Sequence, residues 1–204
     1  MKTKNIRLII FTLFLQSGIY LQAQNNVSIK FTSLSYQFTE TQPDIIKLKL
    51  SQNGQLALEP GVLLSYEGYA SSTTALKVTQ LFMIDKAMHF AGKTQIMIKF
   101  RIVKSFKHSL YFAIGPGLNY RKTWADIAGY IDEPIYNTSS DWQYKLNWLS
   151  GEIEYNYYLS KYFDLSVSLN HIQAESIGLA IGIKYWINKT PSKKNRCISC
   201  PSFH

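Results

Sequence analysis

Apolar and polar residues alternate along most of this chain. In the segment 95–104, QIMIKFRIVK, Ile96 and Ile98 share one parity, whereas Lys99 and Arg101 share the other. Successive side chains of an extended strand point to opposite faces. The segment therefore predicts a strand with one apolar face and one face that carries two positive charges. The same period of two recurs through the chain and favours strands.

Eight such strands are predicted, with approximate bounds 27–38, 55–66, 76–85, 95–104, 110–121, 142–157, 163–170 and 176–185. The parity of the apolar residues shifts inside the first strand, which predicts a β-bulge. Gly115-Pro116-Gly117 predicts a kink in the fifth strand, and parity shifts again at Leu149-Ser150-Gly151 in the sixth. A short hairpin at 45–50 is expected to extend beyond the main sheet, and 122–141 is the longest loop.

The charged residues of these strands fall on the face opposite the apolar one. Seven are positive and six are negative: Lys30, Lys77, Lys99, Arg101, Arg121, Lys145, Lys184, Glu59, Glu67, Asp85, Glu152, Glu154 and Asp164. A charge at the lipid midplane costs roughly 2–4 kcal/mol, so in a membrane these residues must face inward. Eight strands leave an interior just wide enough for side chains to fill. We expect the opposite charges to pair there and to close the lumen.

Two architectures produce this alternation. In a soluble periplasmic, lipocalin-like barrel that binds an apolar ligand, the apolar face points inward, whereas in an outer-membrane barrel it meets lipid. Aromatic residues near strand ends (Tyr66, Trp142 and Tyr185 among them) match an interfacial girdle. Strands of about ten residues span a bilayer at a tilt, and short connections alternate with long ones. The sequence thus predicts an all-β fold, an antiparallel up-and-down transmembrane β-barrel of eight strands.

The two ends of the chain differ from its body. Basic Lys2, Lys4 and Arg7 precede an apolar run at 8–15, and small Ala23 precedes Gln24, as in a cleaved secretory signal. The predicted organisation is a signal peptide at 1–24, removed after Ala23 or Gln24, a barrel at 25–187, and a basic periplasmic tail at 188–204.

The net charge of +9 resides mainly in these ends. The signal and the tail hold seven of the positive charges and no acid, which leaves about +2 for the body. A nucleic-acid-binding protein needs a basic stripe on its body. That function is therefore excluded, and export argues against it as well.

The tail contains Cys197 and Cys200 in a C-x-x-C arrangement. A local disulfide fits an oxidising periplasm; an intermolecular bridge or half of a metal site is also open. Pro201 stands where haem attachment requires His. The basic flank is suited to acidic lipid, peptidoglycan or a periplasmic partner. No metal-ligand spacing appears among the scattered histidines, and no cofactor is predicted.

Over residues 27–187 the pattern resembles the small eight-stranded outer-membrane β-barrel class of Gram-negative bacteria. The resemblance is carried by alternation and by no specific motif. It implies an outer-membrane location, contact with membrane lipid, surface-exposed loops and assembly by the outer-membrane insertion machinery. The class commonly ends on an aromatic residue of its last strand; here Tyr185-Trp186 would close the barrel, and a tail follows from Asn188. We expect a non-enzymatic envelope or binding role in this location.

One enzymatic alternative is kept. The lipid A deacylases are small barrel enzymes that carry a His, a Ser two residues later, and an acidic partner. This chain resembles them at His171, with Glu175 and Ser176 nearby, but Gln173 occupies the position of the nucleophile. A nucleophile must lie beside a base that a carboxylate orients, so the alternative is a membrane-embedded hydrolase that uses His171. Glu152 and Glu154 could mimic an acid/base pair, but ion pairs in the lumen with Lys145, Arg101 or Lys99 account for them better.

Overall fold

The computed structural model describes residues 24–38, 47–51, 55–127, 136–139, 141–172 and 176–187. These contain the strands β1 (Asn25–Gln37), β2 (Leu56–Tyr69), β3 (Thr74–Ile84), β4 (Phe90–Lys104), β5 (His108–Lys122), β6 (Asn137–Ser139), β7 (Trp142–Tyr158), β8 (Phe163–Ile172) and β9 (Ser176–Trp186). Among the described residues, no helix is long and apolar enough to cross a membrane.

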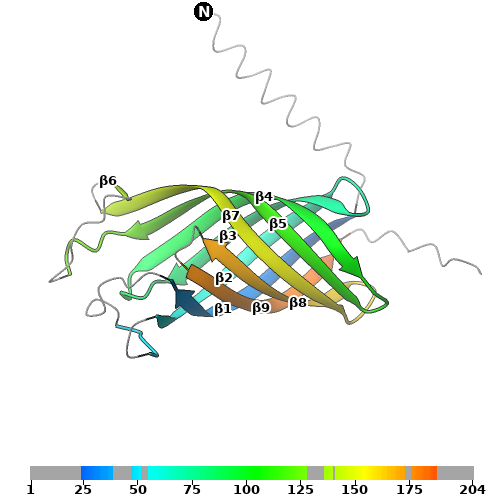
Figure 1. Cartoon of the computed structure of the whole chain (residues 1–204), viewed down its shortest axis with the longest axis horizontal. Helices are drawn as coiled ribbons and strands as arrows, with labels where there is room; N and C mark the ends of the chain where they lie inside the picture. The colour runs from blue at the N-terminus through cyan, green and yellow to red at the C-terminus, as the bar shows by residue number, and fades with distance from the viewer. Residues whose placement is uncertain are drawn as a thin grey trace, which may run out of the picture.

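The strands form one closed antiparallel barrel (Figure 1). Their order is β5-β4-β3-β2-β1-β9-β8-β7-β6, and a further pairing of β5 with β7 closes the sheet. The short β6 pairs only with the first residues of β7. The barrel wall therefore has eight strands, as predicted.

The two ends of the barrel carry different connections. Residues 70–73, 105–107 and 159–162 link strands at one end, which we call the short-turn end. Residues 38–55, 85–89, 123–141 and 173–175 link them at the other, the long-loop end. Strand β1 begins and strand β9 ends at the short-turn end, where Asn26 pairs with Trp186.

The apolar face of the strands points out of the barrel. On β4, Ile96 is 53% exposed and Ile98 50%, whereas Met97 is 1% and Lys99 0% exposed. The same sidedness holds around the wall, where exposed apolar residues alternate with buried polar ones. An apolar belt on a closed barrel is the surface that lipid covers. The soluble barrel with an apolar core is therefore wrong, and the chain is an outer-membrane barrel.

The predicted irregularities of the wall are present. The register of β1 shifts between Thr32 and Leu34 against both of its neighbours, which confirms the bulge. The register of β5 shifts between Gly115 and Gly117, where the kink was expected. On β7, Trp148 and Leu149 are both exposed, as the predicted change of parity requires.

The start of β4, the loop at 122–141 and the hairpin at 45–50 differ from the sequence prediction. β4 begins at Phe90, five residues earlier than expected, and the loop predicted at 122–141 contains β6. Of the hairpin expected at 45–50, the described part forms a single bridge from Lys49 to Ala57, with Leu50 donating to the carbonyl of Leu56 at 2.8 Å.

Candidate functional site: a divided lumen

Seven ionic side chains from six strands meet inside the barrel. We call them the ion cluster: Lys30 (β1), Glu67 (β2), Lys77 (β3), Lys99 (β4), Glu152 and Glu154 (β7), and Lys184 (β9). Each is at most 1% exposed. Four lysines and three glutamates leave one net positive charge, so the cluster nearly neutralises itself.

Glu154 is the centre of the ion cluster. Its carboxylate accepts from Lys30 at 2.9 Å, Lys77 at 2.5 Å and Lys99 at 2.6 Å, and it also contacts Lys184. Alternation along β7 directs this residue inward from the strand that closes the barrel against β5. One carboxylate thus joins strands β1, β3, β4 and β9 across the lumen.

The two other glutamates complete the ion cluster. Glu67 contacts Lys99 at 2.6 Å, Lys184 at 3.1 Å and Lys77 at 3.5 Å. Glu152 contacts Lys77 at 2.6 Å and Lys30 at 3.3 Å. Every lysine of the cluster therefore has at least one carboxylate partner, and charges that would be costly alone are compensated.

An aromatic plug fills the lumen between the ion cluster and the short-turn end. It consists of Tyr69, Tyr111 and Trp186 with Ala75, all buried. The Tyr69 and Trp186 rings lie 5.5 Å apart. Trp186 Nε1 donates to Asp164 at 2.5 Å, and the Lys99 ammonium lies 4.2 Å from the centre of the Tyr111 ring. Plug and cluster together occupy this half of the barrel with packed side chains.

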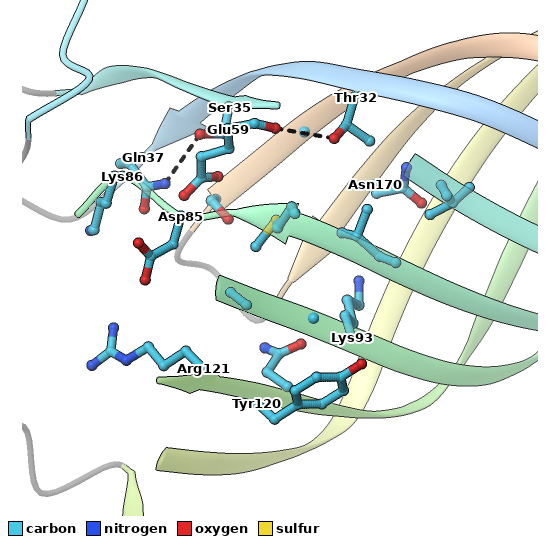
Figure 2. A pocket seen from close by; sticks show the side chains of 18 of the residues that line it. Thr32, Ser35, Gln37, Glu59, Asp85, Lys86, Lys93, Tyr120, Arg121 and Asn170 are labelled. Atoms are coloured by element: carbon cyan, nitrogen blue, oxygen red, sulfur yellow. Dashed lines mark hydrogen bonds between the residues drawn. The ribbon is translucent and has the colours of Figure 1, made fainter. Parts of the chain in front are cut away.

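The half toward the long-loop end contains a cavity of about 360 Å³ (Figure 2). Leu34, Leu63, Leu81, Met83 and Ala91 supply its apolar wall. Its polar lining includes Ser35, Glu59, Asp85, Lys86, Lys93, Asn119, Arg121 and Asn170. A volume of this size lies at the lower end of the range for small-molecule sites.

The rim of the cavity is built around Trp124, which is 3% exposed. Its Nε1 donates to Asp85 at 2.7 Å, and the Arg121 guanidinium lies 3.6 Å from its ring centre. Arg121 also stacks on Tyr136 at 4.0 Å and donates through Nε to Gln143 at 2.8 Å. Trp124 and Tyr136 are thereby held at the rim of the cavity by a hydrogen bond and cation–π contacts.

The thirteen predicted lumen charges thus occupy different levels. Seven form the ion cluster, and Asp164 accepts a hydrogen bond from Trp186 of the aromatic plug. Glu59, Asp85 and Arg121 line the cavity, and Lys145 is buried 5.4 Å from the Tyr136 ring centre. Arg101 is half-buried near the end of β4 and lies outside the cluster. We expected Glu152 and Glu154 to contact Lys145, Arg101 or Lys99; among these, Lys99 contacts Glu154.

The enzymatic candidates lie at the long-loop end. His171 is the penultimate residue of β8. Ser176 is the first residue of β9 and lines the cavity. Glu175 lies outside the described residues, as do Cys197 and Cys200 and the segments predicted as signal and tail. No group of three or more His, Cys, Asp or Glu that could hold a metal ion occurs in the described part of the chain.

Sequence reasoning missed Lys93, Lys86 and Trp124. Lys93 shares its parity with Gln95, Met97 and Lys99, and this signal was available. The signal is weak because Gly92 interrupts the apolar face by which the strand is recognised. In the structure, Gly92 pairs with Tyr120, whose ring covers the position that a side chain would occupy.

No family model matches the sequence, and no curated protein matches it. Solved barrels resemble its fold. The attachment invasion locus protein Ail of Yersinia pestis is 10% identical, with a TM-score of 0.49 over 80% of this chain and 97% of that one. The N-terminal β-barrel domain of Pseudomonas aeruginosa OprF is 12% identical, with a TM-score of 0.47 over 81% and 99%. Outer membrane protein OprG of Pseudomonas aeruginosa is 11% identical, with a TM-score of 0.45 over 82% and 97%.

Proposed function

We propose that this protein is a non-enzymatic outer-membrane barrel that does not conduct solutes and that binds its ligand or partner at the long-loop end. The observation that supports this most strongly is the division of the lumen. Packed ionic and aromatic side chains fill one half, and a cavity of about 360 Å³ occupies the other. Such an interior provides a cavity that is closed toward one end and no open channel through the barrel.

The orientation follows from the connections. Outer-membrane barrels have short periplasmic turns and longer extracellular loops. By this rule the short-turn end, with the aromatic plug, faces the periplasm, and the cavity faces the outside. A molecule from the medium would then reach the cavity, but the ion cluster would block its passage to the periplasm.

Conductance measurement tests the sealed lumen. The mature barrel is inserted into a planar lipid bilayer at a salt concentration of about 1 M, with an open general porin as the positive control in the same membrane. We expect no steps of conductance above the bare bilayer. Regular steps from the wild-type barrel, at a size that scales with salt, would show a continuous water path and would overturn the proposal.

The location of the ends is proposed with the same role. A signal peptide at 1–24 would deliver the chain to the outer-membrane insertion machinery, and a tail at 188–204 would lie in the periplasm beside peptidoglycan or a partner. Mass spectrometry of the protein purified from outer membranes tests both. We expect a mature N-terminus at Gln24 or Asn25, and a mass 2 Da lower than the dithiol form, about two hydrogens, if Cys197 and Cys200 are joined.

A further inference from the structure

Lys93 differs from the other buried lysines of β4 and its neighbours. It is 2% exposed, and no hydrogen bond or ion pair joins its ammonium to another described residue; the Glu152 carboxylate acts on it only at longer range. Lys99, six residues along the same face, contacts Glu67 and Glu154 at 2.6 Å. A buried ammonium that lacks a hydrogen-bonded partner is unfavourable, so Lys93 can pair with a group that enters the cavity.

The position of Lys93 suits a ligand. Figure 2 places it deeper along the barrel than Lys86, Asp85 and Arg121, among the residues that line the cavity. Leu63 and Leu81 belong to the wall at this depth, on the neighbouring strands β2 and β3. A bound molecule would therefore meet a positive charge and an apolar wall together.

The other ionic groups of the cavity already have partners. Asp85 accepts from Trp124 and from the backbone N–H groups of Ala87 at 3.0 Å and His89 at 2.7 Å. Arg121 is held by aromatic rings and by Gln143. Ser35 and the backbone of Lys86 hydrogen-bond Glu59.

Two amides add polar capacity. Asn119 and Asn170 line the cavity, and the side-chain oxygen of each is buried without a partner in the described part of the chain. A donor on the ligand, such as a hydroxyl group, would find an acceptor there.

We propose that the cavity binds a small monoanionic amphiphile, with its carboxylate against Lys93 and its apolar body along Leu63, Leu81 and Met83. One negative charge matches the one Lys93 ammonium, which has no hydrogen-bonded partner among the described residues. A dianion would be disfavoured because the carboxylates of Glu59 and Asp85 belong to the same lining. This inference rests on the proposed function in one respect, since the ligand must reach the cavity from the long-loop end.

Titration calorimetry on the full mature barrel in lipid nanodiscs tests the proposal, with empty nanodiscs as the blank. Four probes share one ring system and differ in charge: 2-naphthoate, 2-naphthalenemethanol, 2-naphthylmethylammonium and 2-naphthyl phosphate. We expect 2-naphthoate to bind at one site, about tenfold or more tighter than the alcohol, as for a charge-assisted hydrogen bond. The ammonium probe and the dianionic phosphate should bind more weakly than 2-naphthoate. Equal affinity for all four probes, or no 2-naphthoate heat above the blank, would overturn the proposal.

Variants locate the site. Lys93→Met should lose about tenfold or more in 2-naphthoate affinity and leave the alcohol unaffected. Lys104→Met removes an exposed lysine from the same strand and should change neither affinity. Heat-modifiable gel mobility confirms that each variant is folded, and the comparison of probes on the wild type needs no variant at all. Unchanged 2-naphthoate affinity in folded Lys93→Met would show that the anion binds elsewhere. Conductance of the wild type is a separate measurement, so a leaky barrel that still binds 2-naphthoate would refute the sealed lumen alone.

Discussion

The ion cluster makes a sharp prediction at Glu154. Its carboxylate contacts the ammonium groups of four lysines, at 2.5–2.9 Å for three of them. Glu154→Gln keeps the size of the side chain but removes its charge, so four buried lysines remain with two glutamates. Removing one partner of a buried ion pair costs about 3–5 kcal/mol because the other charge is left uncompensated. We expect the free energy of unfolding to fall by about this amount.

The assay is guanidinium unfolding of the barrel in lipid vesicles, followed by tryptophan fluorescence and extrapolated linearly to water. Glu152→Gln is the graded control, since Glu152 contacts two lysines where Glu154 contacts four. It should destabilise the barrel less than Glu154→Gln. The double variant Glu154→Gln/Lys184→Gln restores the original net charge and should recover part of the loss.

A loss below about 1 kcal/mol for Glu154→Gln would refute the reasoning, because that is the range of solvent-exposed ion pairs. It would mean that water reaches the centre of the lumen and screens the lysines. The same result would weaken the proposal of a sealed barrel, since a hydrated cluster is compatible with a path for ions.

Three further predictions concern the wall and one of its connections and use the same unfolding assay. Ile98→Arg, at the middle of β4, should cost about 2–4 kcal/mol, and Val103→Arg, near its end, about 0–1 kcal/mol, if lipid covers this face; equal costs would contradict the membrane placement. Gly182→Ala should cost about 1–3 kcal/mol by overpacking, because its new Cβ would meet the Ile29 carbonyl, whereas Gly178→Ala should be far milder because its Cβ would make only an ordinary contact with the Leu34 carbonyl. Met88→Gly should stabilise the barrel by about 1 kcal/mol, since Met88 holds a φ of 67° that glycine adopts freely; a loss of stability would show that the Met88 side chain contributes more than the strain costs.

The faces of the strands could be predicted from the sequence because parity is local. Residues 98 and 99 must point to opposite faces because the strand is pleated. The cost of placing a charge in lipid then decides that Lys99 points inward. The start of β4 could not be predicted in this way. Gly92 has no side chain to mark the outer face, and the Tyr120 ring that covers it belongs to another strand.

Which charged side chains pair inside the lumen depends on the register between strands that are distant in the sequence, and this register cannot be inferred from the sequence. Lys30 and Glu154 are far apart along the chain, and their contact at 2.9 Å requires the stagger of the whole barrel. Glu152 and Glu154 were therefore identified as inward-facing, but most of their partners were not. The cavity was not foreseen either, because an empty volume depends on how far each side chain reaches across the lumen.

Lys93 and Lys99 show how one barrel can be closed and receptive at once. Both extend from the same face of β4, and both are removed from water. At the level of Lys99, glutamates from β2 and β7 cross the lumen and neutralise it. At the level of Lys93, the neighbouring side chains on β3 and β2 are Leu81 and Leu63, which cannot accept a hydrogen bond. The wall thus supplies hydrogen-bonded carboxylates to the lysine in one half of the lumen, and in the other half the proposed ligand would supply one.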